Sequence, residues 1–428
     1  MINRPLRSSI AVLLATLSVA APLGSADVYL QLQRGEKVTI GLPDFNAKEP
    51  GDQAVAQDLR GVTRDDLLYS RLFNLTDQGP QSAGPKIDFA GWAGQGADLL
   101  VTGSVSVKDQ KDGSTAQLIG AVYELPSGNP VFQKSYQIAS RSARKLAHEF
   151  VADILYRFTG NRGLSQSKIV FSNNASGNKE LYVIDYDGLN LRRLTTTKKL
   201  NILPRWSPDG KEILFTSYRR NNPDLYIYSM ETGQTRAVSS RIGLNASASF
   251  SPSGKEILAT LSYEGGAKLY LLDRQGKVIR KLTKGSAADT SASFSPDGRK
   301  IVYVSDRPGW PQIYVMDADG SNSERISETG YCDSPVWSPL GDKIAYSRGT
   351  KSGEHDIVVH DLSSGQAARL TDGSGKNENP SFSPDGRFIV FTSNRNRKRE
   401  LFTVSLDGSS QKKLADIPGD CFTPSWGN

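Results

Sequence analysis

A repeat of about 44 residues fills the second half of the chain and restricts the possible folds more than any other feature of the sequence. One column of aromatic residues advances in steps of 44, 44, 43, 45 and 44 residues, and a second column advances by 44 each time. The first column is Trp206, Phe250, Phe294, Trp337, Phe382 and Trp426, and the second is Tyr182, Tyr226, Tyr270, Tyr314, Val358 and Phe402. A constant period of this length indicates a chain built from repeated supersecondary units.

Each unit has the pattern of four short strands joined by tight turns. The first strand ends at the aromatic residue, and Ser-Pro-Asp-Gly follows it at 207–210, 295–298 and 383–386. Proline presets φ and glycine accepts positive φ, which a tight reversal requires. The second strand alternates apolar and polar residues, as in KEILFTS at 211–217. Four strands per period of about 40–45 residues are typical of a β-propeller blade, so we predict a six-bladed β-propeller.

The two ends of the repeat region complement each other. The first unit, near residue 168, has the second, third and fourth strands but no aromatic first strand before them. The last six residues, TPSWGN at 423–428, form an additional first strand with no unit behind it. We therefore expect the C-terminal strand to complete the first blade and close the ring, which removes the exposed strand edges of an open ring.

Residues 1–26 have the layout of a secretory signal peptide. Arg4 and Arg7 precede an apolar run of about fourteen residues, and Ala26 ends a stretch of small residues suited to cleavage. A membrane anchor is the alternative interpretation, but a spanning helix requires roughly 20 apolar residues. The sequence therefore predicts an exported protein whose mature chain begins at Asp27.

Between the signal peptide and the propeller, strands and helices alternate without a repeat. This order indicates a small N-terminal α/β domain at 27–160, followed by the propeller at 161–428. One helix is expected over 52–73, with a break near Gly61, and another over 142–160. Strands are expected at 27–32, 37–45, 97–107, 115–125 and 130–138.

Charge and cysteine content argue against two kinds of interaction. The formal net charge of the whole chain is +7, and its basic residues are scattered among acidic ones, so nucleic acid is not an expected partner. Cys332 and Cys421 occupy equivalent positions on blades that are separated by one blade. A disulfide requires Cα atoms roughly 4.4–6.8 Å apart, and a chord across the ring is longer, so two free thiols are expected.

Motifs for catalysis or metal binding are weak. The Gly-x-Ser-x-Gly motif of propeller-linked peptidases does not occur in the chain. His355 and His360 are an odd number of residues apart in an expected strand, so their side chains leave opposite faces. We therefore expect neither an enzyme nor a cofactor or metal site.

Sequence variation is concentrated on one face of the expected propeller. The loops between the second and third strands differ from blade to blade, and binding residues tend to lie on varied loops held by a rigid scaffold. Trp310 lies on one of these loops, and tryptophan is enriched at binding hot spots. Five residues before each core aromatic, on the same face, are Asn201, Asn245, Asp289, Cys332, Asn377 and Cys421.

These six residues are predicted to ring the mouth of the central channel and to contact a partner, together with Ser247 and Thr290 beside them. The alternative interpretation is that each one is a turn-forming side chain that satisfies local backbone groups. The sequence leaves both interpretations open.

The whole mature chain resembles the TolB family, the periplasmic components of the bacterial Tol–Pal system. The resemblance rests on the combination of a signal peptide, a small α/β domain and repeats that read P-x-W-S-P-D-G-K, L-Y-x-x-D-x-D-G and R-R-L-T. It implies a non-enzymatic adaptor, monomeric and peripheral to membranes, that supports outer-membrane integrity and constriction during cell division. The implied partners are the peptidoglycan-associated lipoprotein Pal at the channel mouth, TolA at the mature N-terminus and bacteriocins. The residues implied for TolA are Asp27, Val28, Tyr29 and Leu30.

The pattern Asn-x-x-Pro-x-aromatic, which the resemblance assigns to the binding loops, is intact at Asn201 and Asn377. Alanine replaces the proline after Asn245 and Asp289, and cysteine replaces the asparagine in the remaining two blades. The contact set of this chain is therefore expected to differ from the family pattern in detail. A propeller enzyme, such as a lyase or a peptidase relative, and a sugar-binding propeller are the other functional classes considered.

Overall fold

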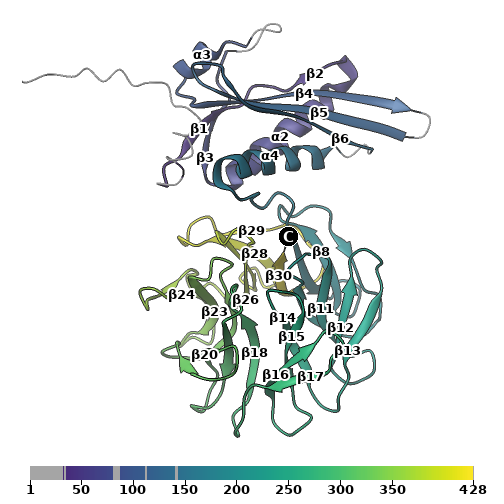
Figure 1. The fold of residues 1–428 in the computed structure, drawn as a ribbon, viewed down its shortest axis with the longest axis vertical. Coiled ribbons are helices and arrows are strands. Elements are labelled where there is room, and N and C mark those ends of the chain that lie inside the picture. Colours follow the sequence, from purple (N-terminus) through teal and green to yellow (C-terminus); the bar gives the residue numbers. More distant parts are fainter. Residues whose placement is uncertain (1–31, 33–34, 81–86, 111–112, 140–142, 428) are drawn as a thin grey trace, which may run out of the picture. The chain divides into compact units, whose positions relative to one another are not determined.

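Two units make up the fold, the first ending at Gly160 and the second starting at Asn161 (Figure 1). The computed structural model describes residues 32, 35–80, 87–110, 113–139 and 143–427. The predicted signal peptide and the residues predicted to contact TolA lie outside this described part of the chain.

The first unit is a mixed sheet with two long helices, α2 and α4, on one of its faces (Figure 1). Its strands run in the order β3-β1-β4-β5-β6, and β2 pairs with β4. Strand β1 is parallel to β3 and β4, whereas β5 is antiparallel to β4 and β6. The elements are β1 (Val38–Gly41), β2 (Asn46–Ala47), η1 (Pro50–Asp52), α2 (Gln53–Tyr69), β3 (Phe73–Thr76), α3 (Phe89–Gly94), β4 (Leu99–Gln110), β5 (Gly113–Glu124), β6 (Pro130–Ile138) and α4 (Arg144–Thr159).

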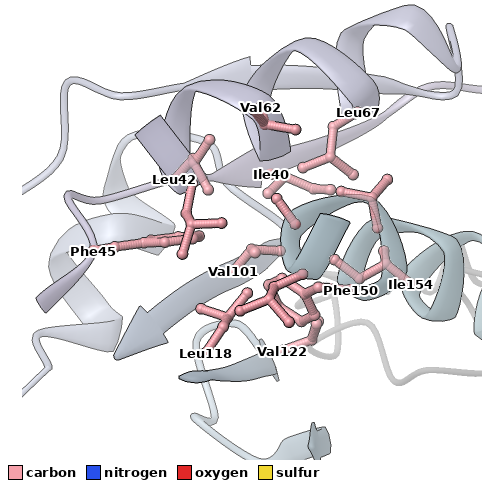
Figure 2. Close-up of a cluster of buried hydrophobic side chains, with 14 of the residues drawn as sticks. Ile40, Leu42, Phe45, Val62, Leu67, Val101, Leu118, Val122, Phe150 and Ile154 are labelled. Atoms are coloured by element: carbon pink, nitrogen blue, oxygen red, sulfur yellow. The ribbon is translucent and has the colours of Figure 1, made fainter. Parts of the chain in front are cut away.

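The core of this unit lies where the apolar stripes of the helices meet the inner face of the sheet. Figure 2 shows Val62 of α2 and Phe150 of α4 directed toward Ile40 of β1 and Val101 of β4, and all four side chains are buried. Burial of such side chains contributes roughly 1.5–3 kcal/mol each to folding. This shared core holds helices α2 and α4 and the six-stranded sheet together as one unit.

The expected break in the first helix is wrong, because α2 continues through Gly61 to Tyr69. Leu59, Val62 and Leu67 of this helix are buried, so its apolar stripe is continuous on both sides of the glycine. A Cβ at Gly61 would meet nothing within 4 Å, which places the glycine on an open face of the helix. Glycine in a helix interior costs only about 1 kcal/mol relative to alanine, and the burial of the stripe outweighs that cost.

In the described part of the second unit, 24 strands form six antiparallel four-stranded sheets, the blades of a propeller. The predicted fold class is thereby confirmed. Blade 1 is β30 (Cys421–Gly427), β7 (Lys168–Asn173), β8 (Glu180–Asp185) and β9 (Arg192–Arg193); blade 2 is β10 (Asn201–Trp206), β11 (Glu212–Ser217), β12 (Asp224–Ser229) and β13 (Thr235–Ser239); blade 3 is β14 (Asn245–Phe250), β15 (Glu256–Leu261), β16 (Lys268–Asp273) and β17 (Val278–Lys281); blade 4 is β18 (Asp289–Phe294), β19 (Lys300–Ser305), β20 (Gln312–Asp317) and β21 (Glu324–Arg325); blade 5 is β22 (Cys332–Trp337), β23 (Lys343–Gly349), β24 (His355–Asp361) and β25 (Ala367–Arg369); and blade 6 is β26 (Asn377–Phe382), β27 (Phe388–Ser393), β28 (Glu400–Ser405) and β29 (Lys412–Lys413).

Ring closure follows the sequence prediction. The C-terminal strand β30 is the innermost strand of blade 1 and pairs with β7 along its length. The Trp426 side chain is buried, and its indole Nε1 donates a hydrogen bond to Ser167 Oγ at 2.9 Å. The Trp426 backbone N–H donates to Ser381 Oγ of blade 6 at 3.0 Å. One residue of the last strand therefore joins the first blade to the sixth.

The Ser-Pro-Asp-Gly segments form the predicted turns between the first and second strands. In blade 2, Ser207 Oγ donates to Asp209 Oδ1 at 2.6 Å and accepts from the Glu212 N–H at 2.9 Å. Gly210 has a φ of 67°, which explains the glycine at the end of the turn. The same serine–aspartate bond recurs in blades 4 and 6, which explains why the turn sequence recurs as well.

A bulge that the sequence did not reveal interrupts the innermost strand of every blade. The pairing register shifts after the second residue of each of these strands. The third residue adopts a left-handed conformation, with φ between 47° and 57°, although none of the six is glycine. These residues are Leu203, Ser247, Ser291, Ser334, Asn379 and Thr423. Because a bulge bends its strand and re-aims side chains, it shapes the wall of the central channel.

Replacement of Trp426 by alanine tests the closure. We expect the Trp426→Ala variant to lose about 3–5 kcal/mol of unfolding free energy, because a buried aromatic side chain and its indole hydrogen bond to Ser167 are removed. Denaturant unfolding of the propeller measures this loss. Trp310→Ala is the matched control, since Trp310 is 56% exposed, and its effect is expected to stay within about 0.5 kcal/mol. Equal effects of the two substitutions would contradict the account.

Candidate binding surface of the propeller

Two kinds of connection lie at opposite ends of the blades. Antiparallel pairing places the start of strand one, the end of strand two and the start of strand three at the same end, as Asn201, Ser217 and Asp224 show in blade 2. We call this end the loop face, because it carries the long connections between strands two and three and between successive blades. The other end carries the Ser-Pro-Asp-Gly turns and the turns between strands three and four, and we call it the turn face.

The six residues predicted to ring the channel mouth are the first residues of the innermost strands, but their side chains are buried. Asn201 Nδ2 donates to Glu180 Oε2 and to Thr197 Oγ1, both at 2.7 Å. Asn245 Oδ1 accepts from Ser239 Oγ at 2.6 Å, and its Nδ2 donates to a backbone carbonyl at 2.7 Å. These buried side chains hold the loops around them and are not exposed on the loop face. Ser247 and Thr290, by contrast, are partly exposed.

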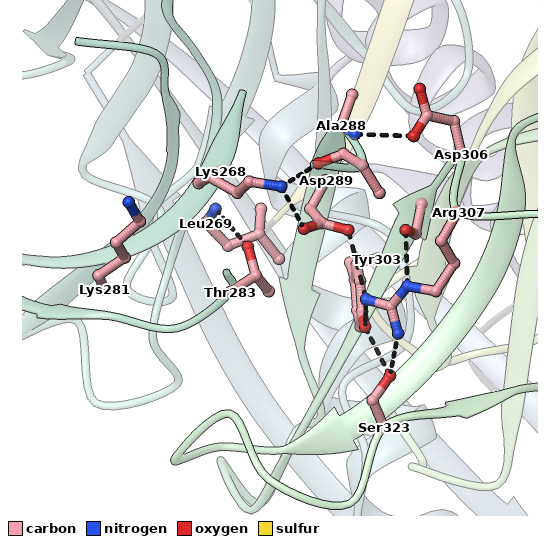
Figure 3. A network of polar contacts seen from close by, with 12 residues as sticks. Lys268, Leu269, Lys281, Thr283, Ala288, Asp289, Tyr303, Asp306, Arg307 and Ser323 are labelled. Atoms are coloured by element: carbon pink, nitrogen blue, oxygen red, sulfur yellow. Dashed lines mark hydrogen bonds and ion pairs between the residues drawn. The ribbon is translucent and has the colours of Figure 1, made fainter. Parts of the chain in front are cut away.

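In blade 4 the ring residue is a carboxylate held between two cations (Figure 3). Asp289 Oδ2 lies 3.4 Å from Lys268 Nζ, and Asp289 Oδ1 lies 3.4 Å from Arg307 Nη2. Lys268 also donates to the carbonyl of Ala287, and Arg307 to the hydroxyl of Tyr303 at 2.9 Å. A buried carboxylate is tolerated only when it is paired and hydrogen-bonded in this way.

Two of the ring residues pair with members of a second polar column that the sequence contained and our sequence analysis missed: Asn201 pairs with Glu180, and Asp289 with Lys268. Its members stand two residues before the column that starts at Tyr182, at the first position of the third strand in five blades and at the second position in blade 5, and all six are buried. They are Glu180, Asp224, Lys268, Gln312, Asp356 and Glu400. These residues recur with the 44-residue period, so the period could have revealed the column in the sequence. Lysine replaces the usual acid or amide only where the ring residue is the carboxylate Asp289.

Stacked arginines add a second support in alternate blades. Arg219, Arg307 and Arg395 each place the guanidinium carbon 4.1 to 4.5 Å from an aromatic ring centroid of the third strand. The rings are those of Tyr226, Tyr314 and Phe402. Arg307 and Arg395 also reach the ring residues of their blades, Asp289 at 3.4 Å and Asn377 at 3.0 Å. The guanidinium groups of these arginines are therefore partly engaged in contacts within the protein.

The exposed side chains of the loop face include both large apolar and basic residues. Around blades 3 to 5, large apolar side chains are exposed, and they include Trp310 at 56%. The others are Ile242, Tyr263 and Tyr331. Around blades 6, 1 and 2, the exposed residues of the loops include the cations Arg397, Lys198, Lys199 and Arg220. Tryptophan and arginine are enriched at protein interfaces, so this mixture suits a protein partner.

Both cysteines are free and buried in the structure. Burial raises the pKa of the Cys332 thiol to about 11 and that of the Cys421 thiol to about 12. A thiol in such surroundings is a poor nucleophile, because the thiolate is the reactive form.

Among the residues that the structure describes, no three His, Cys, Asp or Glu side chains are grouped so that they suit a metal ion. Nor does the described part include a helix long and apolar enough to cross a membrane.

Two family models together cover most of the chain. The model described as the TolB beta propeller domain matches residues 155–428, and the one described as the TolB amino-terminal domain matches residues 27–119. The chain belongs to the TolB family. The unit that carries the loop face and the α/β unit are therefore both TolB domains.

Relatives and solved structures agree with this family. The chain is 36% identical to the Tol-Pal system protein TolB of Geobacter sulfurreducens over 47% of its own length and 49% of the relative's. Against the protein of the same name from Geobacter metallireducens, it is 39% identical over 37% of each chain. The chain thus spans about half the length, or less, of these curated relatives in the matches. The crystal structure of TolB from Acinetobacter baumannii superposes with a TM-score of 0.77, at 26% identity, over 92% of this chain and 97% of that one.

The charge cluster at Asp289 gives a stability prediction for this TolB-family propeller. Removing the cation in Lys268→Met leaves a buried carboxylate with one partner fewer, and the loss of one member of a buried pair costs about 3–5 kcal/mol. Lys300→Met is the matched control, because Lys300 pairs with Asp317 on the surface and such pairs contribute about 0–1 kcal/mol. Urea unfolding of both variants measures the difference. A Lys268→Met variant as stable as the control would show that the cluster does not support the loop face.

Proposed function

We propose that this protein is a non-enzymatic periplasmic adaptor of the Tol–Pal system. It binds a peptidoglycan-associated lipoprotein, Pal, through the loop face around the propeller channel, and it binds TolA through the start of the mature chain at 27–33. It is exported by its signal peptide, acts as a monomer that is peripheral to membranes, and supports outer-membrane integrity and constriction during cell division. Bacteriocins that enter through the Tol system are further partners of the same face.

The observation that carries this proposal is the contrast between the two ends of the propeller. In blades 2, 4 and 6 the turn face repeats one turn sequence held by the same serine–aspartate bond, whereas the loops of the loop face differ from blade to blade. Exposed apolar and basic side chains gather on the loop face, and the buried ring and its partner column hold the loops in place. In this arrangement Ser247, Thr290 and Trp310 are available to a partner. Asn201, Asn245, Asp289, Cys332, Asn377 and Cys421 support the surface from beneath.

An enzyme or a sugar-binding propeller fits these observations less well. A propeller lyase or peptidase relative requires a cluster of His, Arg or acidic groups that is free to act on a substrate. The charged groups next to the ring are instead paired with one another, as Lys268, Asp289 and Arg307 show. The curated relatives are named as components of the Tol–Pal system, which also favours the adaptor.

Binding of the soluble Pal domain to Trp310→Ala tests the proposal. A tryptophan at an interface hot spot contributes about 2 kcal/mol or more, so Kd is expected to rise roughly thirtyfold or more. Isothermal titration of purified mature protein with the Pal domain measures the change. Leu340→Ala is the matched control, because Leu340 is 67% exposed but lies in a turn on the turn face, and its Kd is expected to stay unchanged.

Three outcomes of this experiment would count against the proposal. They are no binding of Pal by the wild-type protein, equal affinities of the wild type and Trp310→Ala, and a loss of affinity in Leu340→Ala instead. A mature chain that lacks residues 27–33 provides the second arm. It is expected to retain Pal and to lose TolA, and full retention of TolA would contradict the assignment of the N-terminus.

A further inference from the structure

The central channel of the propeller contains a cavity of about 340 Å³. Its wall is formed by the innermost strands of several blades, from the left-handed residue of each bulge to the start of the turn-face segments. Side chains at the bulge, such as Ser247 and Asn379, line it together with later residues of the same strands, such as Ser293 and Ser381. A volume of this size is within the range of small-molecule sites in proteins.

Arg205 is the one charged residue among those that line this cavity. It occupies the fifth position of its innermost strand, where the other five blades have Ser249, Ser293, Val336, Ser381 and Ser425. The repeat therefore does not require arginine at this position. Placing a guanidinium inside a channel is unfavourable unless a partner compensates its charge. A partner for Arg205 therefore has to come from the protein or from a molecule in the channel.

The protein itself compensates Arg205 poorly. Its Nη1 donates to two carbonyl oxygens, that of Pro204 at 3.3 Å and that of Pro424 at 3.5 Å. Among the residues that the structure describes, no carboxylate is paired with Arg205, and its Nε and Nη2 have no hydrogen-bond acceptor. The side chain is partly exposed, and this exposed part faces the cavity. Burial among uncharged groups lowers the pKa of Arg205 to about 10, so the guanidinium stays charged at neutral pH.

Hydroxyl groups provide further donors on the same wall. Ser247 and Ser293 line the cavity, and neither hydroxyl has a hydrogen-bond partner within the described part of the chain. Arginine presents its donors in a planar fork that matches the two oxygens of a carboxylate or phosphate. The cavity wall therefore combines one cation, with two nitrogens that have no acceptor among the described residues, and two hydroxyls without a hydrogen-bond partner among them.

We propose that the propeller channel binds a small oxyanion, a carboxylate or a phosphate, with the Arg205 guanidinium as its principal ligand. The anion supplies the charge that the protein does not, and it accepts hydrogen bonds from Arg205 Nε and Nη2. The cavity wall shares Ser247 with the residues available to a partner, but the principal ligand Arg205 is not among those residues. Anion binding therefore does not depend on the proposed function.

Thermal unfolding in inorganic phosphate, at constant ionic strength adjusted with sodium chloride, tests the proposal. The wild-type protein is expected to gain Tm along a saturable curve, because a ligand that binds only the folded state stabilises it by mass action. Arg205→Met is expected to lose this gain, and Arg205→Lys to retain part of it. Arg299→Met, which removes an exposed arginine of a turn-face segment, is the matched control and is expected to keep the wild-type curve. Acetate in place of phosphate distinguishes a carboxylate site from a phosphate site.

A wild-type protein without a saturable gain in either anion would overturn the proposal, and so would a wild-type curve in Arg205→Met. If Arg205→Met fails to fold, bromide soaked into crystals of the wild-type protein decides the question by its anomalous signal. A bromide peak at hydrogen-bond distance from the Arg205 guanidinium supports the site. An empty channel in crystals that bind bromide elsewhere rejects it.

Discussion

The pairing of β30 with β7 is the interaction on which the rest of the propeller depends. It joins residues about 250 positions apart in the sequence, and without it blade 1 lacks its innermost strand. The last strand is also linked to both of its neighbours around the channel. Trp426 N–H donates to Ser381 of blade 6, and Trp206 Nε1 of blade 2 donates to the Ser425 carbonyl at 3.1 Å. Closure therefore positions the channel wall as well as the end of the chain.

Much of this fold could be predicted from the sequence because it follows from periodicity. A constant period of 44 residues, an aromatic residue at each innermost strand and a proline–glycine turn behind it predict blades, their number and the closing strand. These features are local, and each recurs six times or nearly so. A departure from the pattern in one unit therefore does not obscure the repeat. The α/β unit has no repeat, and there the predicted helix break at Gly61 was wrong. Only the packed helix shows that its apolar stripe continues past the glycine.

The candidate site was harder to predict, for two physical reasons. Burial at the first position of an innermost strand depends on how the loops fold over it, and neither the type nor the spacing of Asn201 or Asn245 reports this. The bulge at the third position is occupied by residues such as Leu203 and Ser247. Unlike glycine, these residue types do not indicate a left-handed conformation in the sequence. In contrast, the second polar column and the departure of Arg205 from the repeat were both present in the sequence. Aligning every position of the repeat, beyond the aromatic ones, would have found them.

Amide hydrogen exchange along β30 tests the central claim of ring closure most directly. If the C-terminal strand is the innermost strand of blade 1, its inter-strand amides exchange only when the whole propeller opens, with protection equal to that of the corresponding amides in β10 and β26. Exchange of the β30 amides orders of magnitude faster than those of β10, as in a fraying chain end, would contradict the closure on which the channel and the loop face rest.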